Sequence, residues 1–304
     1  MLNTKSRFSH SPMRHFKERV IEFLLFLAAL SAVAITVAIV VILVTESLGF
    51  FEHVSLKEFL TGTQWTPLFE DAHYGILPLV AGTLVVTGVA LVVAVPLGII
   101  IALYLSEFAP HKVRETVKPF MELLAGVPTV VYGYFALLFV TPLLQATIMP
   151  DLPGFNMLGP GIVIGIMIIP YISSLSEDAM RAVPSAMREG SYAMGATRFQ
   201  TALMVVIPAA TSGIVAAFIL GISRAVGETM VVAIAAGQQP NFTWDPTESA
   251  ATITAYIVQV AMGDLPHDSI GYQSIFAVGL VLLLLTLVFN VLGHLVRKHY
   301  REVY

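Results

Sequence analysis

Long apolar runs, separated by short polar stretches, dominate the chain. A helix that crosses a bilayer needs about 20 apolar residues, because each residue advances the helix by about 1.5 Å. Six runs reach this length and predict an all-α membrane protein with six transmembrane helices. They lie near residues Ile21–Val44, Leu77–Leu105, Pro119–Leu144, Gly161–Met180, Pro208–Gly237 and Ile275–Val296.

Two apolar segments need separate interpretation. The first run is too long for a signal-peptide core and lacks a clear cleavage site, so we interpret it as a retained anchor that follows a cytoplasmic segment, residues 1–20. The stretch Ala251–Gly263 is too short to cross a bilayer. Ile253, Tyr256 and Val260 lie on one face of a helix there, which predicts a surface or re-entrant helix.

The basic residues orient the predicted helices. Of 16 lysines and arginines, 14 lie on one side of a six-span topology, while Lys57 lies on the other side and Arg224 inside the fifth span. Because cytoplasmic loops carry the excess of basic residues, both termini and the loops after spans two and four are expected to be cytoplasmic. The 14 residues are Lys5, Arg7, Arg14, Lys17, Arg19, Lys112, Arg114, Lys118, Arg181, Arg188, Arg198, Arg297, Lys298 and Arg301.

Composition excludes several kinds of protein. The chain is 57% hydrophobic and 12% charged, with too little polar residue content for a soluble domain. It has no cysteine, which excludes disulfides and thiolate metal sites, and its histidines show no metal-ligand spacing, so no cofactor is expected. The phosphate-binding pattern GxxxxGK[ST] is also absent, so any ATP hydrolysis must come from a partner subunit.

The polar segment after the fourth run has strong local signals. Pro184 suits the first turn of a helix, and Gly195 can adopt the left-handed conformation that ends one. Thr197 and Gln200 have capping-box spacing for a second helix, which Pro208 is expected to close. These signals predict a helix–turn–helix elbow that suits a groove on another protein.

This elbow resembles the EAA loop of ABC importer permeases. The stretch EGSYAMG, from Glu189 to Gly195, is followed after nine residues by VVIP, which ends at Pro208. The family pattern is E-A-A-x3-G-x9-I-x-L-P, and here Gly and Ser replace the two alanines. The resemblance implies that Glu189, Gly195 and Pro208 belong to a coupling loop, about residues 181–208, that inserts into a cytoplasmic ATPase. The alternative is an ordinary amphipathic connector.

A charged pair lies inside the fifth apolar run. Arg224 and Glu228 are four residues apart, which would place them on one helix face, and Ser223 and Thr229 add hydroxyl groups. An arginine at the centre of a membrane helix costs about 2.5–3.5 kcal/mol. The pair therefore either lines a pathway or fixes helix packing, and a guanidinium suits tetrahedral oxyanions.

The motif SRAVGET around this pair resembles the R-A-x-G-E element of permeases for phosphate, sulfate and molybdate. Phosphate permeases typically continue with threonine, as Thr229 does here. The resemblance implies that Ser223, Arg224, Glu228 and Thr229 line the translocation pathway. In this hypothesis Arg224 assists the passage of an anion, and Glu228 prevents the anion from binding too tightly.

The third apolar run narrows the choice of transported substrate. Its glycines and Pro128 predict a kinked or tightly packed helix, and Glu122 is expected at the membrane surface. The sequence ELLAGVPTVVYG, which begins at Glu122, resembles the C-type permease of bacterial phosphate ABC transporters. Near the inner end of the fourth run, Glu177 and Asp178 are expected to be solvated.

The resemblance implies a type I ABC importer permease fold over residues 21–304 and a multi-pass position in the inner membrane. The implied partners are a homologous A-type permease, two copies of a cytoplasmic ATP-binding subunit, an extracytoplasmic phosphate-binding protein and membrane lipid, but no nucleic acid. The chain itself would catalyse no covalent step. Alternatives are a sulfate, molybdate or tungstate permease, a membrane enzyme, or a passive channel.

Overall fold

Helices form almost the whole of the computed structural model, which describes residues 12–67, 69, 71–266 and 269–299. Within these residues, six helices are long and apolar enough to cross a membrane, which agrees with the predicted number. The elements are α1 (Pro12–Phe51), α2 (Leu56–Thr61), α3 (Leu77–Leu103), η1 (Tyr104–Phe108), α4 (His111–Ala125), α5 (Thr129–Phe135), η2 (Ala136–Val140), α6 (Thr141–Thr147), α7 (Leu158–Arg181), α8 (Ser185–Ala193), α9 (Arg198–Thr201), η3 (Ala202–Val206), α10 (Ile207–Val226), α11 (Met230–Ala235), α12 (Ile253–Gln259), η4 (Val260–Asp264) and α13 (Ile270–His299).

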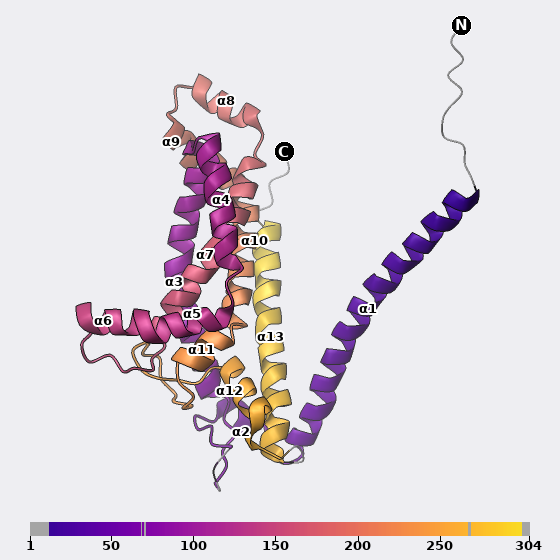
Figure 1. Ribbon diagram of the computed structural model, residues 1–304, viewed down its shortest axis with the longest axis vertical. Coiled ribbons are helices and arrows are strands. Elements are labelled where there is room, and N and C mark those ends of the chain that lie inside the picture. Colours follow the sequence, from indigo (N-terminus) through magenta and orange to yellow (C-terminus); the bar gives the residue numbers. More distant parts are fainter. Residues whose placement is uncertain (1–11, 68, 70, 267–268, 300–304) are drawn as a thin grey trace.

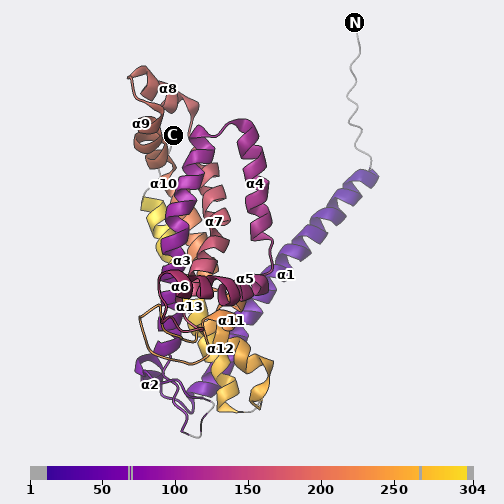
Figure 2. The same cartoon turned by 60° about the vertical axis from the view of Figure 1, so that its left-hand side comes forward.

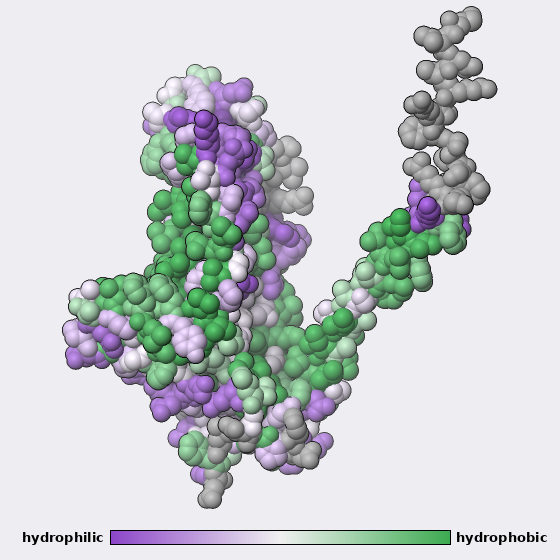
Figure 3. Space-filling view, viewed as in Figure 1, coloured by the Kyte–Doolittle hydropathy of each residue, from purple (hydrophilic) through white to green (hydrophobic). Residues whose placement is uncertain are grey.

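The two ends of the molecule differ in charge. The start of α1, the junction of α3 with α4, the α8–α9 elbow and the end of α13 share one end, while α2 and α12 lie at the other (Figures 1 and 2). Figure 3 shows apolar side chains along the middle of the helices and hydrophilic ones towards both ends. The predicted basic side is therefore the elbow end. Residues 1–11, with Lys5 and Arg7, and Arg301 lie outside the described residues.

Helices α3, α7 and α10 form the centre of the bundle, and α1 contacts the rest mainly through α13. Glycines let α3 and α7 approach closely. A Cβ atom on Gly165 would lie 2.8 Å from both the Ala90 carbonyl oxygen and the Val93 Cβ. Around this contact, buried Ile164 and Ile168 belong to the largest apolar cluster.

The third predicted span starts too early, because the corresponding apolar helix covers Thr129–Thr147. Helix α4 ends at Ala125, and a new helix, α5, begins after Pro128. A residue before proline disfavours the helical conformation, and proline has no N–H to continue the ladder, so the chain turns at Val127. The segment α5–η2–α6, residues Thr129–Thr147, lies across the long axis of the bundle (Figures 1 and 2).

Two further boundaries differ from expectation. Helix α1 begins at Pro12, before the expected start of the span. Pro208 does not end a helix, because the chain is helical from Arg198 to Val226. The π-helical turn η3 precedes Pro208 and rearranges the hydrogen-bond ladder where proline cannot donate. Helix α12 forms as predicted, and its buried apolar residues fit the re-entrant alternative rather than a surface helix.

The close approach of α3 and α7 gives a test of the fold. We expect Gly165→Val to destabilise the folded protein by about 2 kcal/mol, because the added side chain collides with the backbone of α3. Thermal unfolding of the purified protein measures the effect. Gly88→Val in α3 is the matched control, because nothing lies within 4 Å of a Cβ there. Equal destabilisation by both substitutions would contradict the packing.

Candidate functional site

The elbow at the basic end forms from the signals predicted in the sequence. Pro184 precedes α8, and Gly195 follows its end with φ of +85°, a conformation that favours glycine. The capping box is also present: Thr197 Oγ1 accepts from the Gln200 N–H at 3.3 Å, and Gln200 Oε1 accepts from the Thr197 N–H at 2.9 Å. The Oγ atoms of Ser191 and Thr201 lie 2.8 Å apart and join the two arms of the elbow.

The outer surface of the elbow is available to a partner. Glu189 is exposed in α8, as are the apolar side chains of Tyr192, Met194 and Phe199; Met194 is 88% exposed. Exposed apolar side chains beside charged groups are typical of an interaction surface. The structure therefore brings Glu189 and Gly195 together on the elbow, while Pro208 lies in the helix that leads away from it.

A partly buried ion pair, which sequence analysis missed, fixes the elbow to the bundle. Arg188 donates to both carboxylate oxygens of Glu107, at 3.2 and 2.8 Å, and to the carbonyl oxygens of Met180 and Val183, at 2.8 and 2.6 Å. Arg198 donates to the Glu107 carbonyl oxygen at 3.3 Å. These contacts join α8 to η1, which continues α3, and to the end of α7.

A second ion cluster joins α4 to the inner end of α7. Lys118 Nζ lies 2.7 Å from Glu177 Oε2 and 2.8 Å from Asp178 Oδ1, and Arg181 lies 3.5 Å from Glu177. Glu177 is 0% exposed, so the expectation that it is solvated is wrong, whereas Asp178 is exposed. Burial alone would lower the pKa of Lys118, but its contacts with Asp178 and Glu177 raise that pKa above the usual value.

The predicted pair in the fifth span does not share a helix face. Helix α10 ends at Val226, Gly227 caps it, and the chain is not helical at Glu228. Instead, the guanidinium of Arg224 lies 4.6 Å from the centre of the Tyr171 ring. Glu228 turns to the start of α11, where its Oε1 accepts from the Val231 N–H at 3.4 Å. Arg224 and Glu228 therefore form no ion pair within the part of the chain that the structure describes.

Arg224 keeps free hydrogen-bonding capacity. Its Nε atom and the Ser223 Oγ are buried and have no hydrogen-bond partner among the described residues. Contact with the face of Tyr171 stabilises the cation without using its N–H groups. The Thr229 Oγ1 donates to the Gly227 carbonyl oxygen at 3.2 Å. The half-buried cation of Arg224 therefore lies beside the break between α10 and α11, and its buried Nε–H has no partner among the described residues.

Helix α12 supports this break from outside. Thr254 Oγ1 donates to the Glu228 carbonyl oxygen at 2.6 Å. Tyr171, which contacts Arg224, also lines a cavity of about 240 Å³ between α4 and α7. Lys118, Glu122 and Ser174 line the same cavity. Tyr171 therefore connects the surroundings of Arg224 with the ion cluster at the basic end.

Comparison with known proteins gives one family. A family model described as "Binding-protein-dependent transport system inner membrane component" matches residues 94–302. The chain is 38% identical to the probable ABC transporter permease protein YqgH of Bacillus subtilis, over 87% of this chain and 85% of that protein. It is 31% identical to the phosphate transport system permease protein PstC of Haemophilus influenzae, over 96% of each chain.

Solved structures support the fold. A chain of the bacterial alginate ABC transporter, in complex with an alginate pentasaccharide-bound periplasmic protein, matches with a TM-score of 0.64. The match covers 96% of this chain and 100% of that one at 18% identity. A chain of the MetNI methionine ABC transporter matches with a TM-score of 0.54 at 19% identity, over 75% of this chain and 95% of that one.

The ion cluster predicts a specific stability pattern. Lys118→Met should destabilise the protein by about 3 kcal/mol, because it leaves the buried carboxylate of Glu177 without its nearest cation. Adding Glu177→Gln should recover most of this loss, since the buried charge is then removed. Thermal unfolding of the purified protein measures both effects.

Lys112→Met on the same helix provides the control. Lys112 is exposed and has no carboxylate partner in the described part of the chain, so its substitution should change stability little. A double variant less stable than Lys118→Met alone would contradict the interpretation.

Proposed function

Because the chain belongs to the family of binding-protein-dependent transport system inner membrane components, we propose that it is a permease subunit of an ATP-driven phosphate importer in the inner membrane. The half-buried guanidinium of Arg224, with unused donors beside a helix break, is the observation that carries the proposal. A planar fork of N–H donors matches the oxygens of phosphate. The names of the curated relatives favour phosphate over other oxyanions.

The proposed partners follow from the two ends of the chain. At the basic end, the exposed elbow with Glu189 and Gly195 docks into one of two copies of a cytoplasmic ATP-binding subunit. Within the membrane, an A-type permease supplies the other half of the pathway. At the opposite end, an extracytoplasmic phosphate-binding protein delivers the anion. In this assembly the chain binds and moves the substrate, and the partner hydrolyses ATP.

The ion pair of Arg188 with Glu107 gives the elbow a rigid connection to the bundle. When the ATP-binding subunits close, they displace α8. Arg188 bonds to η1, which continues α3, and to the end of α7. The displacement therefore passes to α3 and α7, which pack closely together. Charge-assisted, bidentate hydrogen bonds hold their geometry better than single neutral ones.

Arg224 and Glu228 have separate parts in the proposed pathway. Arg224 is not neutralised by Glu228, so its charge remains available to an anion that enters beside Ser223. Glu228 is 7% exposed and holds the start of α11, while its charge keeps the local field from becoming strongly positive. An anion can then be attracted without being trapped. Thr229 shapes the break between them.

Uptake of labelled phosphate by cells that lack this gene tests the proposal. Deletion should abolish high-affinity uptake of phosphate and leave sulfate and molybdate uptake unchanged. The wild-type gene should restore uptake, and Arg224→Gln should reduce the restored rate by about tenfold or more, because the buried pathway loses its cation.

Assembly of the complex must be measured beside uptake, by co-purification of the ATP-binding subunit. Arg19→Gln, at an exposed position in α1, is a charge-matched control that should leave uptake unchanged. Loss of sulfate or molybdate uptake alone would overturn the choice of phosphate. Normal uptake by an assembled Arg224→Gln complex would overturn the role of Arg224.

Substitution of Arg188 tests the transmission of movement. Arg188→Gln removes the bidentate pair and should lower phosphate uptake by about tenfold, while ATP hydrolysis in the assembled complex continues. The informative quantity is therefore ATP hydrolysed per phosphate transported, which should rise.

Arg198→Gln is the comparison variant, because Arg198 contacts Glu107 only through one carbonyl oxygen. It should have a smaller effect on this ratio. The double exchange Glu107→Arg with Arg188→Glu should recover part of the coupling. A proportional fall of hydrolysis and uptake in Arg188→Gln would instead indicate a role in assembly alone.

A further inference from the structure

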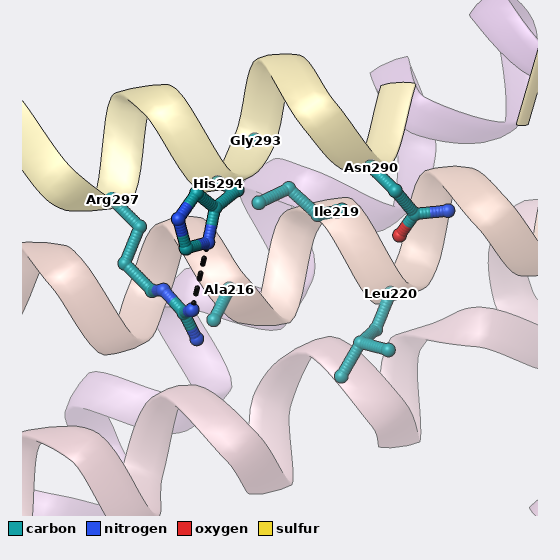
Figure 4. Close-up of a pocket in the computed structure, with 7 residues that line it drawn as sticks. All are labelled: Ala216, Ile219, Leu220, Asn290, Gly293, His294 and Arg297. Atoms are coloured by element: carbon teal, nitrogen blue, oxygen red, sulfur yellow. Dashed lines mark hydrogen bonds between the residues drawn. The ribbon is translucent and has the colours of Figure 1, made fainter. Parts of the chain in front are cut away.

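A groove between α10 and α13 opens at the basic end of the bundle (Figure 4). One cavity of about 250 Å³ has apolar walls from Ala216, Ile219 and Leu220 of α10. Its polar wall comes from α13 and includes Asn290, His294 and Arg297. A second cavity, of about 540 Å³, shares His294 and Arg297 and adds Ser212 and Lys298. Together the two cavities form one groove, apolar on one side and basic at its end.

The basic side chains turn into this groove. Figure 4 shows the His294 ring and the Arg297 guanidinium directed from α13 towards Ala216 on α10. Arg297 donates to His294 Nδ1 at 3.1 Å, which uses one N–H group and leaves its other donors free. The two helices approach closely at Gly293, where an added Cβ would collide with Ile219. Both residues line the groove, which therefore runs along this close contact.

The cations of this groove lack the carboxylate partners that three other cations at the same end have. Lys118, Arg181 and Arg188 each pair with a carboxylate. Arg297 and Lys298, in contrast, form no ion pair with any carboxylate of the described residues. Two cations in a groove, with no acidic partner in the part of the chain that the structure describes, attract an anion.

The apolar wall identifies the kind of anion. Leu220 is 54% exposed, and Ile219 lies beside it in the same wall. These side chains lie on the membrane-core side of the cations, since α13 reaches Arg297 and Lys298 only at its end. A soluble phosphate ion would gain nothing from such a wall. A phospholipid uses both parts, because its phosphate binds the cations while an acyl chain covers the apolar side chains.

We propose that this groove binds an anionic phospholipid of the cytoplasmic leaflet. The headgroup phosphate accepts hydrogen bonds from Arg297 and Lys298, and one acyl chain lies against Ile219 and Leu220. The bound lipid neutralises the end of α13 and fills the space between α13 and α10. Because α10 carries Arg224 at its other end, the lipid supports a helix of the pathway. The inference needs the basic end to be cytoplasmic and does not depend on which substrate is transported.

Lipid retained by the complete transporter complex tests the inference. The complex is purified in mild detergent, and its bound phospholipids are quantified by mass spectrometry. The double variant Arg297→Gln with Lys298→Gln should retain about tenfold less phosphatidylglycerol and cardiolipin, because both phosphate contacts are lost. Retained phosphatidylethanolamine should not change.

Two further variants distinguish a groove from general surface charge. Lys112→Gln with Arg114→Gln removes the same charge from α4 at the same end and should leave lipid retention unchanged. Ala216→Phe keeps both cations but fills the groove, and it should also reduce retention of the anionic lipids. Co-purification of the ATP-binding subunit confirms that each variant assembles.

Four results would overturn the inference. Three concern the variants: unchanged retention in the Arg297→Gln, Lys298→Gln variant, an equal loss in the α4 control, and full retention in Ala216→Phe. Displacement of the bound lipid by inorganic phosphate at concentrations that saturate transport would also overturn it, because the groove would then be a site for the free anion.

Discussion

The cost of placing an ionised group in apolar surroundings governs where this bundle is rigid. A charge removed from water is destabilising unless a partner compensates it, and the loss of one partner then costs more than the pair contributes. Glu107 is held by Arg188, Glu177 by Lys118, and Arg224 by the ring of Tyr171. Each of these contacts joins different helices. The interactions that compensate these charges are therefore also the ones that connect the helices.

These charge-compensating contacts explain how movement of the small elbow can reach the membrane helices. The elbow has few contacts of its own with the membrane helices, since α8 packs mainly on α9 and η3. Its bidentate ion pair reaches α3, and the backbone contacts of Arg188 reach the end of α7. These two helices have close glycine contacts, so neither can move far without the other. Movement of the elbow therefore moves α3 and α7 together.

Local signals explain which parts of the structure the sequence could predict. The elbow was predicted because Pro184, Gly195 and the Thr197 capping box each determine the backbone within a few residues. The six spans were predicted from length and hydropathy. The ion pair of Glu107 with Arg188 joins residues 81 positions apart, and no spacing rule relates them. The break at Gly227 was also missed, because the apolar run continues through it and a single glycine is tolerated in membrane helices.

The break at Gly227 also explains why α12, a helix too short to cross the membrane, is buried in the protein. Interrupting a helix in apolar surroundings frees backbone carbonyls, and each must find a donor. Thr254 of α12 supplies one to Glu228. The opposite side of α12 packs on the outer loops, where the rings of Tyr256 and Trp65 lie 5.0 Å apart. Helix α12 therefore joins the outer loops to the break beside Arg224. Through α12, the outer loops contact the region around Arg224. The ion pairs connect the elbow to the same bundle from the opposite end.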